Sequence, residues 1–445
     1  MNPHGVFCPN PDCPVRGRVG AGTIYIHSRT PPRYRCTVCR KTFSERAGTP
    51  FYRRSTAEAI ITLVVTLVAH GCPIAAIVAA FGFQRQTVCA WLDAAGSHGE
   101  AVQRQLVCQP RDLGAVQADE IRVRQQGGIV WVALAMLVAT RLWLGGMVSP
   151  RRDGALIARL CALVRACALP APLLICVDGF AAYVKQIRRM ARLRLPRNGK
   201  RGRCRRVAWP GLVIGQVVKQ REAGRVVGVT RRLAHGPAAW AARLLGGGTI
   251  QTAYIERLNG TFRARLATLV RRTRAGGRTV ARLERGMWLV GTVYNFCTPH
   301  GSLAHGQTPA MASGITDHLR AVDELLHYRV PPAPWQPPTK WGRRTKAEAV
   351  ALTAVGALRL GEAAVQPQRH DAFIGRLLVR GGRDRRAAGT GHEDDVMSRH
   401  AALPPVSVGP AMPTDRRSPV VLAKGRHQSA AFWARRLSIS ERCWR

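Results

Sequence analysis

The chain has 445 residues and a mass of 48.6 kDa, which is a prior for about two or three domains. Its 68 lysines and arginines face 25 aspartates and glutamates, for a formal net charge of +43, and 46% of its residues are hydrophobic, enough for a folded core. This charge excludes most soluble metabolic enzymes and indicates a polyanionic partner, with nucleic acid first and a membrane surface second.

The cysteine content and the apolar stretches predict a cytoplasmic chain. Thirteen cysteines are too few for a disulfide scaffold of this length, and the first ten residues, MNPHGVFCPN, lack the pattern of a secretory signal. Two apolar stretches, 60–81 and 128–148, are interrupted by polar or helix-breaking residues. We expect both stretches in a buried core, with no membrane partner.

Residues 1–54 predict a small module that a metal holds together. Two close cysteine pairs, in CPNPDC and YRCTVCRKTF, are separated by a short segment with strand signals. Because each pair is expected on a tight turn, four thiolates can converge on one Zn²⁺ in a zinc ribbon. The predicted ligands are Cys8, Cys13, Cys36 and Cys39. An unstructured arm with four free thiols is the alternative.

Residues 55–105 predict an all-α helix-turn-helix domain. One helix is expected over 74–81, a turn at Gly82 and a second helix over 86–95, with a preceding helix over 55–70. The start of the second helix would enter the major groove of DNA, where arginine and glutamine recognise base edges. The expected contacts are Arg85, Gln86 and Thr87. The alternative is a three-helix unit that never contacts DNA.

Residues 112–320 predict an α/β domain. Strand signals extend over about 115–148, a helix follows over 153–167, and the apolar strand APLLICVD comes next. A basic run and a hairpin, together at about 185–235, are interpreted as an insertion. A further helix begins near residue 249.

Three carboxylates stand out because acidic residues are scarce. Asp119 in AVQADEIRVRQ and Asp178 in LLICVDGFAAY lie at expected strand ends, and Glu256 lies on a helix in YIERLNGTFRARL. A carboxylate at the end of a buried strand is costly unless it is paired or binds a metal. Together the three predict an oxygen cage for two Mg²⁺ or Mn²⁺ ions. A structural salt bridge to an arginine is the alternative for each.

These segments and the later YNFCTPHGSLAHGQTPAM resemble the catalytic core of DDE transposases and integrases of bacterial insertion sequences. With a zinc ribbon and a helix-turn-helix in front, the chain over about 8–320 is most similar to the "insertion sequence one" type. The resemblance implies an α/β ribonuclease H-like core, a mixed sheet with flanking helices, whose element order the sequence also predicts. It implies Asp119, Asp178 and Glu256 as the metal triad. Asn259 and Arg263 are then expected near the DNA backbone.

Glu256 is the less certain third ligand. It is separated from Asp178 by 77 residues, roughly twice the usual interval in integrase cores, and the insertion is expected to account for the surplus. Glu222, at the hairpin turn, remains a rival. Glu120 follows Asp119 directly and is expected on the opposite face of the strand, which makes it a poorer ligand.

The basic run over 185–206 is expected to neutralise DNA phosphates and to add affinity with little sequence information. A solvated surface loop is compatible with that role. The residues assigned to phosphate contacts are Arg188, Arg189, Arg201, Arg203 and Arg205.

The predicted function is a DNA transposase that binds transposon ends and target as double-stranded DNA and cleaves and joins strands with Mg²⁺ or Mn²⁺. We expect a homo-oligomer on DNA in the bacterial cytoplasm, associated with the nucleoid. The first alternative is an inactive remnant that only binds DNA, and the second is a nuclease that cuts without joining. Residues 331–445, a Pro- and Arg-rich linker and tail without periodicity, are expected to be disordered or to come from a shifted reading frame.

Overall fold

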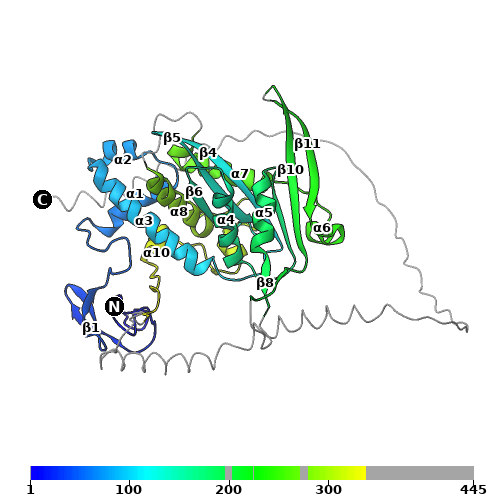
Figure 1. The fold of residues 1–445 in the computed structure, drawn as a ribbon. Helices are drawn as coiled ribbons and strands as arrows, with labels where there is room; N and C mark the ends of the chain where they lie inside the picture. Colours follow the sequence, from blue (N-terminus) through cyan, green and yellow to red (C-terminus); the bar gives the residue numbers. More distant parts are fainter. Residues whose placement is uncertain (1, 196–202, 224, 271–278, 337–445) are drawn as a thin grey trace, which may run out of the picture. The chain divides into compact units, whose positions relative to one another are not determined.

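The computed structural model describes residues 2–195, 203–223, 225–270 and 279–336 (Figure 1). The predicted tail from 337 onward lies outside the described residues. Near the N-terminus, three antiparallel strands form a small sheet with its own hydrophobic cluster around Tyr34. Its strands are β1 (Ile24–Arg29), β2 (Pro32–Cys36) and β3 (Thr42–Ser44).

Three helices follow in the predicted order: α1 (Glu58–Ala69), α2 (Ile74–Phe81) and α3 (Arg85–Leu106). Helix α2 has the expected bounds and ends at Gly82, whose φ of 68° is left-handed and suits glycine. Helix α3 is longer than predicted because its second half packs on α8 (Val280–Cys297), where Gly99 lies against Trp288. The three helices therefore share one hydrophobic core with the domain that follows.

A six-stranded mixed sheet forms the centre of that domain, in the order β11-β10-β7-β4-β5-β6. Strand β4 is antiparallel to β5 and β5 to β6, while β7 runs parallel to both of its neighbours. The mixed sheet and its flanking helices agree with the predicted fold class at that level. The strands are β4 (Ala115–Gln125), β5 (Gly128–Leu137), β6 (Trp143–Ser149), β7 (Leu173–Asp178), β10 (Leu212–Glu222) and β11 (Arg225–His235).

The hairpin that was expected within an insertion forms two strands of the main sheet. Strand β10 pairs with β7 from Leu212↔Leu173 to Val217↔Asp178. The physical reason is visible in its first half, LVIGQV, which is buried throughout like a central strand. A separate small hairpin, β8 (Arg192–Arg194) and β9 (Arg206–Ala208), lies within the basic run.

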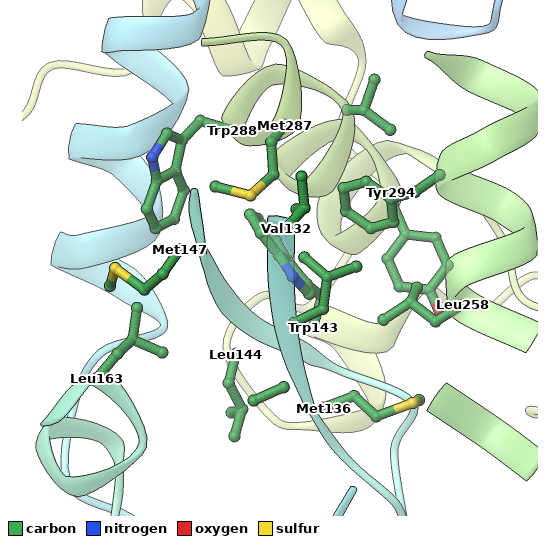
Figure 2. Close-up of a cluster of buried hydrophobic side chains, with 14 of the residues drawn as sticks. Val132, Met136, Trp143, Leu144, Met147, Leu163, Leu258, Met287, Trp288 and Tyr294 are labelled. Carbon is green, nitrogen blue, oxygen red and sulfur yellow. The ribbon is translucent and has the colours of Figure 1, made fainter. Parts of the chain in front are cut away.

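Helices cover both faces of the sheet. In β6, Gly145 lies against Leu163 of α4 (Gly154–Cys167), and the next residue, Gly146, lies against Met287 of α8. Since successive residues of a strand point to opposite faces, α4 and α8 are on opposite sides. Figure 2 shows part of the hydrophobic core, with Leu163 of α4 and with Trp143 beside Trp288 of α8, whose rings are 5.2 Å apart. Besides α4 and α8, the helices that border the sheet are α5 (Ala181–Met190), α6 (Ala238–Leu245) and α7 (Ala253–Arg265).

The segment YNFCTPHGSLAHGQTPAM has a structural role here. Asn295 is fully buried, and its Oδ1 accepts a hydrogen bond of 2.9 Å from the Trp143 backbone N–H. Its Nδ2 donates to the Trp143 carbonyl at 2.8 Å, so one side chain satisfies two backbone groups on the edge strand β6. Thr308 caps the short helix α9 (Pro309–Ala312), and α10 (Val322–His327) follows.

No helix in the described part of the chain is long and apolar enough to cross a membrane. The apolar stretch 60–81 is divided between α1 and α2, and 128–148 forms β5 and β6.

The close contact between α8 and β6 gives a test of the packing. A Cβ at Gly291 would lie 2.0 Å from the Trp143 ring, so Gly291→Ala should lower the free energy of unfolding by about 1–3 kcal/mol. Urea denaturation measures the change. Gly260→Ala in α7 is the matched control, because nothing lies within 4 Å of that position and alanine favours the helix. Equal stability of Gly291→Ala and wild type would contradict the packing.

Candidate functional site

The four predicted zinc ligands come together in the N-terminal sheet module. The Cys8 and Cys39 sulfurs are 3.6 Å apart and those of Cys13 and Cys36 are 3.9 Å apart. All four Sγ atoms lie within 4.8 Å of one another. Sulfurs at the corners of a tetrahedron with Zn–S bonds of about 2.3 Å would be about 3.8 Å apart, so the residues fit a zinc ion.

Burial opposes charge on two of these thiols, Cys8 and Cys13, whereas hydrogen bonds outweigh burial and lower the pKa of Cys39. Burial raises the pKa of Cys13 to about 11 and shifts the pKa of Cys8 further in the same direction. Deprotonating several thiols in so small a volume is unfavourable unless a cation lies between them. The arrangement is therefore suited to a metal rather than to four free thiolates.

The second cluster is built from the register of two parallel strands. Strands β4 and β7 pair from Ala115↔Leu174 to Gln117↔Cys176, and each carries an aspartate two residues further on. Asp119 and Asp178 therefore lie side by side, as predicted. Ligand oxygens of Asp119, Glu120 and Asp178 lie within 4.8 Å of one another.

The presence of Glu120 in this group corrects the expectation that it is a poor candidate. Arg152, in the loop before α4, brings it in: Arg152 Nη2 donates to Glu120 Oε2 at 2.8 Å and to Asp178 Oδ2 at 2.7 Å. The guanidinium also lies 4.4 Å from the centre of the Phe180 ring. Beyond the end of the β4–β7 ladder, one cation thus joins a carboxylate of β4 to a carboxylate of β7.

Helix α7 covers the other side of Asp119 and is tied to β4 by two buried amides. Gln117 Oε1 accepts the Ile255 backbone N–H at 3.0 Å, and Gln117 Nε2 donates to the Gln251 carbonyl at 2.9 Å. One turn later, Asn259 Nδ2 donates to Asp119 Oδ2 at 2.8 Å. Asn259 is only 3% exposed, and the role that the structure gives it is to orient Asp119.

Glu256 lies on the first turn of α7 and lines the same pocket, but it is outside the 4.8 Å group. Its Oε1 accepts from Lys219 Nζ at 2.7 Å and from the Thr252 hydroxyl at 3.1 Å. The expected triad is therefore brought to one pocket, with its helix member held by a lysine. The rival Glu222 is exposed at the end of β10 and is not among the pocket's lining residues.

The pocket has a volume of about 760 Å³ and combines these carboxylates with cations. Burial raises the pKa of Asp119 to about 7, and the negative charges of Glu120, Asp178 and Glu256 add to the shift. Asn259, which lines this pocket, has a buried Oδ1 without a hydrogen-bond partner among the described residues. Hard oxygen ligands with excess negative charge fit a divalent ion such as Mg²⁺ or Mn²⁺.

The remaining residues assigned to DNA lie apart from one another along the chain. Arg85, Gln86 and Thr87 are exposed on the first turn of α3, where the helix-turn-helix interpretation puts them. Exposed positions are also found for Arg188, Arg189, Arg203 and Arg205. Arg263 is half-buried and lines the carboxylate pocket, and Arg201 lies outside the described residues.

Several residues of the site gave no clear signal in the sequence. Gln117 and Arg152 are polar residues within or beside apolar segments, and only the fold shows that Gln117 bonds the start of α7 and that Arg152 contacts two carboxylates. Alternation along β4 gave the face of Gln117 and Asp119, but it could not reveal a cation bridging to Glu120.

No model of a known protein family matches the chain, and no curated protein matches its sequence.

Removing one cysteine ligand tests the zinc cluster. We expect Cys36→Ser to lose about one equivalent of zinc and the ordered structure of residues 2–54, because small ribbons obtain their folding energy from the metal. Elemental mass spectrometry and hydrogen exchange measure the two effects. Cys72→Ser, which changes a cysteine outside the cluster, should keep its zinc. Unchanged zinc content in Cys36→Ser would contradict the assignment.

The raised pKa of Asp119 predicts a pH-dependent cost to stability when no divalent ion is added. The folded state holds the Asp119 proton more tightly than the unfolded state, so the cost is absent below the ordinary aspartate pKa of 3.8, grows as the pH rises to about 7, and is constant above that. Asp119→Asn should therefore melt like wild type below pH 3.8 and at a higher temperature near pH ~8. A difference in melting temperature that does not vary with pH would exclude this account.

Proposed function

We propose that the protein is a DDE-type DNA transposase that cleaves and joins phosphodiesters with divalent metal ions. One observation carries the proposal: Asp119, in the middle of β4, and Asp178, at the end of β7, both lie two residues beyond the last pair of these parallel strands, with Glu256 on a helix that lines the same pocket. Two carboxylates so placed cost free energy unless they bind cations. The chain's net charge of +43 makes nucleic acid the most suitable polyanionic substrate.

The order of the strands supports a ribonuclease H-like core for this function. An antiparallel meander of β4, β5 and β6 is followed by α4 and then by β7, which returns beside β4. This is the order expected from the sequence, with the first and fourth strands adjacent. Strand β10 extends the sheet in parallel on the far side of β7.

When bound, two divalent ions would activate the attacking oxygen and stabilise the leaving 3′ oxygen of a phosphodiester. Asp119 and Asp178 are the residues that would hold them, and Glu256 would complete the set. Asn259 keeps Asp119 oriented through its 2.8 Å hydrogen bond, and Gln117 fixes the start of α7 relative to β4. Arg263, in the lining of the pocket, offers positive charge toward a phosphate.

Recognition of transposon ends is assigned to the N-terminal elements. The exposed first turn of α3 carries Arg85, Gln86 and Thr87, and arginine and glutamine form bidentate contacts with base edges. The exposed arginines of α5 and the β8–β9 hairpin would neutralise phosphates on double-stranded DNA. We place such a protein, as a homo-oligomer on DNA, in the bacterial cytoplasm.

An inactive remnant that only binds DNA is the second candidate. The observation in its favour is that internal cations already neutralise part of the carboxylate pocket. Arg152 forms an ion pair with Asp178 at 2.7 Å, and Lys219 forms one with Glu256 at 2.7 Å. Binding without cleavage would support this candidate.

Substitution of a single aspartate separates the two candidates. We expect wild type to cut a labelled duplex carrying the gene's flanking ends in Mg²⁺ or Mn²⁺, and Asp178→Asn to cut at least about a hundredfold more slowly. Binding of the duplex should persist, as a gel-shift assay measures. Glu222→Gln is the matched control, because it removes an exposed carboxylate outside the pocket. Equal cleavage by wild type and Asp178→Asn would overturn the proposal.

Strand joining is measured separately from strand cleavage. A product in which the cut 3′ end is linked to a second duplex identifies a transposase, whereas cutting without that product identifies a nuclease.

A further inference from the structure

The ion pair between Lys219 and Glu256 links the carboxylate pocket to the β10–β11 hairpin. Lys219 lies on β10 and Glu256 on the first turn of α7, and their side chains are 39% and 46% exposed. The Glu256 oxygen that accepts from Lys219 also accepts from the Thr252 hydroxyl. Held in this way, Glu256 lines the pocket but stays outside the group formed by Asp119, Glu120 and Asp178.

Lys219 stands where β10 leaves the rest of the sheet. Pairing with β7 ends at Val217↔Asp178, and beyond it β10 continues with β11 as its partner. Figure 1 shows this hairpin extending past the neighbouring strands. Arg221, two residues after Lys219, lines the same pocket, so two cations of the hairpin form one wall of a site whose base is acidic.

A phosphodiester in the pocket would lie among these two cations as well as the carboxylates. An ammonium group binds a phosphate oxygen as readily as a carboxylate, and Arg221 would add a second contact. The Lys219–Glu256 pair is half-exposed, and such pairs stabilise a fold only slightly. Arg152 differs, because its Nη2 contacts two carboxylates at once and its guanidinium lies against the Phe180 ring.

We propose that Lys219 is a latch that responds to nucleic acid. In the free protein it holds Glu256 back, and when a phosphodiester of DNA enters the pocket Lys219 binds the phosphate and frees Glu256 to join Asp119 and Asp178. Metal binding is thereby coupled to substrate binding. This inference rests on the proposed function, because it concerns the same carboxylate site.

The coupling is measured as Mn²⁺ affinity of the zinc-loaded full chain by calorimetry, with and without a 12-base-pair duplex that a gel shows to be intact. Lys219→Met should raise the affinity without DNA by up to about fivefold, since the competing ion pair is lost. The gain in Mn²⁺ affinity caused by the duplex should shrink by the same factor.

Arg225→Met is the matched control, because it removes an exposed cation of the same hairpin, opposite Glu222. It should leave both affinities unchanged.

A second background shows whether the effect passes through Glu256. In Glu256→Gln no carboxylate remains that Lys219 could withhold from the metal, so adding Lys219→Met should give no further gain in Mn²⁺ affinity. A gain of the same size in that background, or no gain in Lys219→Met alone, would overturn the latch.

The failure of the proposed function gives a different result. If Mn²⁺ binding is absent in every protein, or is unaffected by Asp119→Asn and Asp178→Asn, the metal site itself is wrong. If binding depends on the aspartates but not on Lys219, the metal site stands and only the latch is wrong.

Discussion

The register between two parallel strands determines the site. Pairing of β4 with β7 brings Asp119 and Asp178 to the same edge, and it stops two residues earlier, at Gln117↔Cys176. The open end of the ladder leaves room for carboxylate oxygens to gather within 4.8 Å. Gln117, the last paired residue of β4, holds the start of α7 through two hydrogen bonds. A shift of one residue would turn Asp119 toward the opposite face and break the contact with Asn259.

Neighbouring cations balance the buried negative charge of the acidic pocket in this basic chain. Negative charge is concentrated where burial makes it costly, and burial raises the pKa of Asp119 accordingly. Two neighbouring cations pair with different carboxylates. Arg152, held against an aromatic ring, neutralises Glu120 and Asp178, whereas the half-exposed Lys219 pairs with Glu256. One side of the pocket is thus firmly paired, and the other can exchange its partner for a phosphate.

Short-range sequence patterns predicted the features that depend on neighbouring residues. The spacing of the four cysteines predicted their cluster, and Gly82 marked the end of α2. The predicted strand end is found at Asp178, whereas Asp119 lies in the middle of β4. The features that the sequence did not predict arise from contacts between distant segments. Asn259 is buried against Asp119, 140 residues away, and Arg152 reaches Glu120 across 32 residues. Strand β10 was taken for part of an insertion because a sequence shows a hairpin but not the β7 strand beside it.

The most direct test is a crystal structure of the protein grown in Mn²⁺, with anomalous scattering recorded to locate metals. The account predicts manganese between the carboxylates of Asp119 and Asp178, and zinc among Cys8, Cys13, Cys36 and Cys39. The zinc signal serves as a control within the same crystal. Zinc in the ribbon with no manganese in the carboxylate pocket, and with Arg152 still bonded to Asp178, would contradict the central claim that these aspartates form a metal site.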